Sequence, residues 1–137
     1  MTTHSLLLAF IAATSAGDID WSPTFEAALE RAANEARVIF VAVHLPGERA
    51  NERMAKNVYT DKRITKLAER TVNLIAVSME QYGKRGARID FGDLDEDQLR
   101  RLEIEIRGKI LKPDAEGFVV APQHVFLDPQ GTVLLSV

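Results

Sequence analysis

Three side chains of this sequence, His44, Glu48 and His124, are of the types that bind metal ions or transfer protons. His44 directly follows an apolar run at 38–43 and Glu48 comes shortly after it, whereas His124 lies near the carboxyl end. Two imidazoles and one carboxylate can hold a metal ion or carry out acid–base catalysis. Their spacing, however, matches no established metal-binding motif. We therefore expect no metal site, no cofactor and no catalytic residue, and keep an enzyme that uses these three residues as the alternative.

The composition excludes several other kinds of chemistry. The 137 residues include no cysteine, so disulfides, thiolate nucleophiles and zinc–thiolate sites are impossible. The net charge is −3, and the lysines and arginines between 49 and 70 are interrupted by Asp and Glu. A nucleic-acid partner would instead be indicated by a concentrated basic patch. The length fits a single domain, and we expect no nucleic-acid partner.

The elements that would position these residues start with the apolar run at 38–43. Six consecutive apolar residues, three of them valine, predict a strand buried on both faces. The run ends at His44, and Pro46 and Gly47 interrupt the backbone before a helix expected over 48–57. In α/β proteins, the loop after the carboxyl end of such a strand commonly carries the functional residues. The candidates in this part of the chain are His44, Glu48, Arg49 and Asn51.

Further helices are expected from capping residues and apolar stripes. Ser22 can cap the first, with Pro23 in its first turn, and Asp61 can cap another. The segment 93–110 is ambiguous, because 102–106 alternates like a strand while the acidic start suits the positive end of a helix dipole. The length of this segment favours a helix.

The remaining strands are expected at 72–79, 123–127 and 132–137. Because helices separate the strands at 38–43 and 72–79, these two strands should pair in parallel with a right-handed crossover. Residues 128–131, Asp-Pro-Gln-Gly, have the preferences of a type I turn. The last two strands should therefore form an antiparallel hairpin, which gives an α/β fold with a mixed sheet.

Several of these features occur in the order typical of one family. They are Trp21, Phe25, Ala28, Leu29, the apolar run 38–43, Met54, Pro122 and the sequence Phe-Leu-Asp-Pro-Gln-Gly at 126–131. In this order they resemble the bacterial thioredoxin-like domains. The resemblance covers 18–137, with an insertion at about 81–119. It implies a thioredoxin-like fold, with a central mixed sheet, a parallel βαβ unit, a carboxyl-terminal antiparallel hairpin and flanking helices.

The functional residues of that family change the expectation for this chain. Counting back from Met54, the two redox cysteines of the family fall on Glu48 and Asn51, neither of which can form a thiolate. The cis-proline of the family falls on Pro122, beside the groove in which thioredoxins hold extended peptides. The resemblance thus implies a non-redox module that binds or scaffolds a protein or peptide. The candidate binding residues are His44, Glu48, Arg49, Asn51, Ala121, Pro122 and His124.

One face of the sheet is expected to lack cover, because the final helix of the family has no counterpart in this sequence. A helix-sized apolar patch of about 400 Å² is near the largest that monomers expose. We expect it to be covered by the apolar segment 6–13, by another subunit, or by sequence absent from this chain. A second copy of the chain, or a larger assembly in which the chain is a structural subunit, is therefore an alternative to a peptide partner.

The segment 1–17 is either a signal peptide or an apolar helix that packs on the domain. Residues 6–13 are apolar and 14–16 are small, as in a signal peptide, but 1–5 include no lysine or arginine. The segment is too short to span a bilayer. A cleaved signal would place the domain in the periplasm or outside the cell, and a retained helix would leave it in the cytoplasm.

Overall fold

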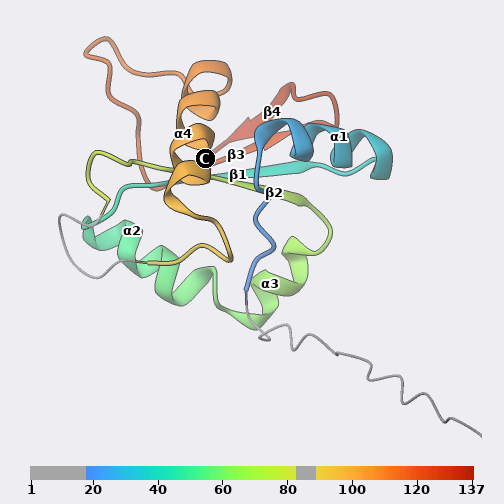
Figure 1. The fold of residues 1–137 in the computed structure, drawn as a ribbon, viewed down its shortest axis with the longest axis horizontal. Helices are drawn as coiled ribbons and strands as arrows, with labels where there is room; N and C mark the ends of the chain where they lie inside the picture. The colour runs from blue at the N-terminus through green and yellow to red at the C-terminus, as the bar shows by residue number, and fades with distance from the viewer. Residues whose placement is uncertain (1–17, 83–88) are drawn as a thin grey trace, which may run out of the picture.

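The computed structural model describes residues 18–82 and 89–137, and its central feature is a mixed four-stranded sheet (Figure 1). The strands lie in the order β2-β1-β3-β4. Their bounds are β1 Ile39–His44, β2 Val72–Val77, β3 Gln123–Leu127 and β4 Val133–Ser136. β1 pairs with β2 in parallel and with β3 antiparallel, and β3 pairs with β4 antiparallel. The expected parallel βαβ unit and the expected hairpin are both confirmed.

Helices cover the sheet on both faces. They are α1 Phe25–Glu35, α2 Arg49–Arg53, a π-helix at Met54–Val58, α3 Lys62–Ala68 and α4 Glu96–Lys109. Figure 1 shows α1 and α4 on one side of the sheet, and α2 and α3 on the other. No helix in 18–82 or 89–137 is long and apolar enough to cross a membrane. The interpretations of the segment 1–17 lie outside the described residues.

The unbroken apolar runs of β1 and β2 arise because each strand contributes to two cores. Ile39 lies in a core with Phe25 of α1 and Ile106 of α4. Ala42 lies in the second core, on the opposite face, together with Tyr59. Successive strand residues point to opposite faces, so a strand covered on both sides needs apolar residues at every position.

The expected helix start at Ser22 is wrong. Thr24 caps α1 instead, and its Oγ1 accepts a hydrogen bond from the N–H of Ala27 at 3.0 Å. Ser22 is buried at the edge of the sheet, because its N–H donates to the carbonyl of Asn73 at 2.8 Å. Pro23 therefore precedes the helix and does not lie in its first turn.

The other two helix starts follow from local capping. Asp61 caps α3, as expected. The helix expected in 93–110 is confirmed, and it begins with a capping box. The side chain of Asp95 accepts from the N–H of Gln98 at 2.8 Å, and the side chain of Gln98 accepts from the N–H of Asp95 at 3.0 Å. The strand-like alternation nearby arises because Ile104 is an apolar residue on the exposed face of α4, where it is 66% exposed.

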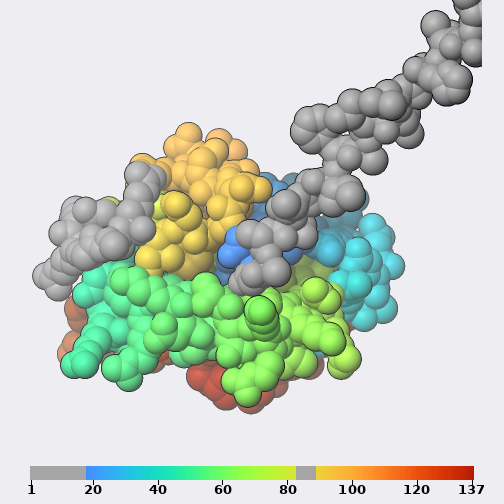
Figure 2. Space-filling model, turned by 90° about the horizontal axis from the view of Figure 1, so that it is seen from below, coloured from blue at the N-terminus to red at the C-terminus, as the bar shows by residue number. Residues whose placement is uncertain are grey.

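β3 and β4 are joined by the turn 128–131, in which the N–H of Gly131 donates to the carbonyl of Asp128 at 2.9 Å. β4 forms the edge of the sheet, and all four of its residues are exposed. Leu135 is 52% exposed, and Val137 after the strand is 66% exposed. Figure 2 shows this end of the chain, in red, at the margin of the molecule beside the green α2–α3 segment. The expectation that one face of the sheet lacks cover is therefore wrong for β1 and β2, which helices cover on both faces, and the exposed apolar residues of the sheet lie in the edge strand β4.

Candidate functional site

The turn between β1 and α2 is held by the carboxylate of Glu48. Gly47 has a positive φ of 78°, which glycine adopts readily, and it directs the chain toward the helix. Oε1 of Glu48 accepts a hydrogen bond from the N–H of Ala50 at 3.1 Å, and Oε2 accepts from the N–H of Asn51 at 2.9 Å. These bonds favour the ionised carboxylate and lower the pKa of Glu48. Glu48 is thus the N-cap of α2.

Asn51 is fully buried and joins the turn to the end of β1. Its Oδ1 accepts a hydrogen bond from the N–H of Leu45 at 3.0 Å, and its Nδ2 donates to Oε2 of Glu48 at 2.6 Å. Glu48 and Asn51 are the two positions to which the resemblance assigns the redox cysteines. In this chain a hydrogen bond joins these positions, and the side chain of Asn51 stabilises the turn without reaching the surface.

His44 ends β1 inside the fold and is only 2% exposed. Its ring lies edge-on to the ring of Phe91, with 5.1 Å between the centroids. Burial lowers the pKa of His44 from 6.5 to about 4, and the negative charges of Glu52 and Glu48 oppose this effect only in part. His44 is therefore neutral near pH 7 and contributes to packing.

His124 lies on the same face of the sheet as His44 but has partners of its own. Its ring stacks on Phe40 with 5.4 Å between the centroids, and its Nε2 lies 2.9 Å from the hydroxyl of Tyr59. Burial lowers the pKa of His124 as well. His44, Glu48 and His124 do not form one cluster. The described residues contain no group of three His, Asp or Glu side chains that could hold a metal ion.

Pro122 lies at the same end of the sheet as the turn 45–51, where β1 finishes. The antiparallel register pairs Val43 with Gln123, so Pro122 lies next to the carboxyl end of β1. The Ala121–Pro122 peptide bond is cis. Residues that are far apart in the sequence therefore meet at this end of the sheet.

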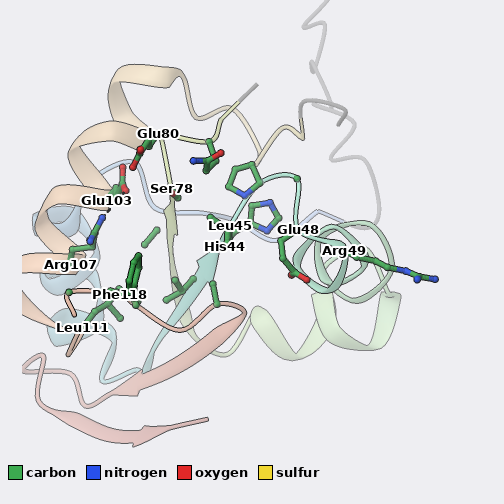
Figure 3. Close-up of a pocket in the computed structure, with 18 residues that line it drawn as sticks. His44, Leu45, Glu48, Arg49, Ser78, Glu80, Glu103, Arg107, Leu111 and Phe118 are labelled. Atoms are coloured by element: carbon green, nitrogen blue, oxygen red, sulfur yellow. Dashed lines mark ion pairs between the residues drawn. The ribbon is translucent and has the colours of Figure 1, made fainter. Parts of the chain in front are cut away.

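A cavity of about 660 Å³ opens at this end of the sheet, on the face that α4 covers (Figure 3). It lies between the ends of β1 and β2, helix α4 and the segment 117–121. The predicted binding residues that line it are His44, Glu48, Arg49 and Ala121. The other predicted residues, Asn51, Pro122 and His124, do not line it.

Sequence reasoning missed the α4 wall of this cavity. Oε2 of Glu103 accepts a hydrogen bond from the N–H of Met79 at 3.1 Å, and Oε1 of Glu103 lies 3.6 Å from Nη1 of Arg107. Phe118 lines the cavity from the opposite loop and is 67% exposed. The apolar run at 118–120, which belongs to no helix or strand, is a sequence signal for the opposite loop and not for the α4 wall.

Comparison with known proteins identifies the fold. No family model and no curated protein matches this chain. Among solved structures, the chain is similar to the DsbH oxidoreductase, with 14% identity, a TM-score of 0.59, and coverage of 98% of this chain and 82% of the other. It is also similar to a candidate disulphide-isomerase from Bacteroides thetaiotaomicron, with 21% identity, a TM-score of 0.54, and coverage of 88% and 80%. The fold is thioredoxin-like.

The thioredoxin-like fold does not bring redox chemistry to this chain. Thiol–disulfide exchange requires a thiolate that attacks a disulfide sulfur. The 137 residues include no cysteine, so this thioredoxin-like chain has no thiol–disulfide activity.

Proposed function

We propose that this thioredoxin-like chain is a non-catalytic binding module that holds an extended segment of a protein or peptide. The partner segment lies at the carboxyl end of β1, between the turn 45–51 and Pro122. The observation that carries this proposal is the cavity of about 660 Å³ that opens at this end of the sheet and extends from Glu48 to Ala121.

The titratable side chains at this end of the sheet favour binding over catalysis. The carboxylate of Glu48 is bonded to backbone N–H groups, and His44 is buried and neutral near pH 7. Among the described residues, every buried side-chain nitrogen and oxygen has a hydrogen-bond partner. A general base or nucleophile needs a free and suitably titrating group, whereas a binding site needs mainly shape and apolar surface.

The test is peptide selection on the immobilised full chain, followed by measurement of the affinity of the selected peptides by fluorescence polarisation. Pro122→Ala is expected to weaken binding by roughly tenfold or more, because it alters the backbone that borders the site. Pro129→Ala, in the distant turn 128–131, is the matched control and should leave the affinity unchanged. Equal binding by wild type and Pro122→Ala would contradict the proposal.

A second candidate function is that of a subunit in a larger assembly, and the exposed edge strand β4 favours it. Leu134, Leu135 and Val137 are all more than half exposed. Edge strands with exposed apolar residues and no charge readily pair with other chains. Sedimentation velocity across a range of protein concentrations tests this function, because a chain that remains monomeric at high concentration does not assemble with itself.

A further inference from the structure

We infer that the partner segment carries a large apolar side chain next to a basic one, and that the cavity between α4 and the segment 117–121 holds the apolar side chain. This inference rests on the proposed binding function and specifies the chemistry of the partner. It is carried by the lining of the cavity, the placement of Phe118 and the charge of the rim.

The floor of the cavity is aliphatic and includes small residues. Val43 and Ala76, near the ends of β1 and β2, line it together with Leu111, Val119 and Ala121. Small side chains at Ala76 and Ala121 leave space into which an aromatic or branched side chain fits. The volume of about 660 Å³ is within the range of ligand sites. A polar side chain on this floor would lose its hydration without gaining a partner, so an apolar side chain is the occupant that fits.

Phe118 gives the cavity an exposed aromatic wall. Phe118 is 67% exposed, yet hydrogen bonds fix the loop that carries it. Oδ1 of Asp114 accepts from the N–H groups of Glu116 and Phe118, both at 2.9 Å. The N–H of Asp114 donates to the carbonyl of Phe118 at 2.8 Å. A ring whose backbone is already held in place can pack against an incoming side chain at a low cost in conformational entropy.

The rim of the cavity carries a surplus of negative charge. Arg107 is already paired with Glu103, with 3.6 Å between the charged atoms. Figure 3 shows Arg49 pointing away from the cavity, on the far side of Glu48. The lining thus carries the carboxylates of Glu48, Glu80 and Glu103 against two guanidinium groups, and among the described residues no ion pair joins Glu48 or Glu80 to another lining residue. A basic side chain beside the apolar anchor complements this charge, and an acidic one is repelled.

The experiment uses labelled heptapeptides of the sequence Gly-Ser-Ala-Xaa-Zaa-Ser-Gly, titrated with the full chain by fluorescence polarisation. Peptides with Phe or Leu at Xaa and Lys at Zaa are expected to bind roughly tenfold tighter than the peptide with Ala and Lys. Phe118→Ser should remove most of this difference. Val120→Ser is the matched control, because Val120 is 71% exposed on the same loop but does not line the cavity. It should change the affinity by less than about twofold.

The charge of the rim is tested with the same peptides. In the wild type, Lys at Zaa should bind several-fold tighter than Glu, and the difference should shrink as salt concentration rises. Glu80→Gln should reduce this preference while the preference for Phe over Ala remains. A preference that Glu80→Gln does not change would overturn the basic half of the inference.

The outcomes separate this inference from the proposed function. If the selected peptides bind and are sensitive to Pro122→Ala, but Phe118→Ser and Val120→Ser behave alike, the chain binds peptides beside Pro122 and the apolar-anchor inference is wrong. Equal affinity for the Phe, Leu and Ala peptides, or no binding of any of them at millimolar concentration, also overturns the inference. Insensitivity of the selected peptides to Pro122→Ala would instead remove the proposed function itself.

Discussion

The turn 45–51 and the edge strand β4 use their side chains in opposite ways. In the turn, Glu48 and Asn51 are hydrogen-bonded to backbone N–H groups, and Asn51 is fully buried. In β4, apolar side chains such as Leu135 are exposed. At the two positions to which the resemblance assigns redox cysteines, this chain therefore has polar groups that stabilise its own turn. The turn contributes polar groups to the rim of the cavity, whereas β4 and Phe118 expose apolar surface to a partner.

The largest expected effect is the pH dependence that His44, directly before the turn 45–51, gives to the free energy of unfolding. The pKa of His44 is about 4 in the folded chain and 6.5 for an ordinary histidine. Between these values the unfolded chain binds a proton that the native chain does not, so stability falls as the pH decreases. We expect a loss of about 3 kcal/mol from pH ~6.5 to pH ~4, measured by urea unfolding.

Two variants assign this pH dependence to its source. His44→Phe keeps a ring against Phe91 but removes the titrating group. Most of the decrease of the free energy of unfolding between pH ~6.5 and pH ~4 should therefore disappear. His124→Gln should keep the contribution of His44 and lose only a smaller contribution of the same sign, because burial also lowers the pKa of His124. A slope that is the same in wild type and His44→Phe would rule out His44 as the source.

Asn51→Ala should have the next largest effect. The substitution leaves the N–H of Leu45 without its acceptor and removes the donor to Glu48. An unsatisfied buried group and a lost hydrogen bond together should lower the free energy of unfolding by about 2 kcal/mol. Asn57→Ala, at an exposed position of the π-helix, is the control and should change it little. If the two variants were equally stable, the turn would not be held in the way the structure shows.

Glu48→Ala should cost less than Asn51→Ala. Both variants remove bonds within the same turn, but Glu48 lies at the surface, where water can replace its carboxylate at the N–H groups of Ala50 and Asn51. The measurement is the thermal midpoint of each variant at one pH, with Arg49→Ala as a control that removes an exposed neighbour. A larger shift for Glu48→Ala than for Asn51→Ala would reverse the assignment of the two side chains.

The sequence predicts those parts of the fold whose cause is local. The unbroken apolar run at 38–43 predicts β1 because both faces of that strand are covered, and Asp61 predicts the start of α3 because capping needs only neighbouring residues. The start of α1 is not predictable in this way. Ser22 suits a cap as well as Thr24 does, and it is a distant residue, Asn73, that holds Ser22 in the sheet edge.

The candidate site is predictable only in its β1 half. The position of Glu48 at the N-terminus of α2 follows from the break at Pro46 and Gly47 directly after a buried strand. The opposite wall comes from α4 and the segment 117–121, which no local pattern connects with the turn. The polar sequence at 48–53 also gives no indication that Asn51 is buried, because its burial depends on how the turn closes over it. Tertiary packing, and not residue type, decides which of these side chains reach a ligand.

The smallest expected effect on stability is that of Leu135→Ser in the edge strand. Leu135 is exposed, so the change in the free energy of unfolding should stay within about 0.5 kcal/mol by urea unfolding. Leu127→Ser, on the neighbouring strand β3, is the contrast, because Leu127 is fully buried and its loss should cost several-fold more. A cost for Leu135→Ser that approaches the cost for Leu127→Ser, and that grows with protein concentration, would show that another copy covers β4 in solution. The contrast between the turn and the edge strand would then no longer hold.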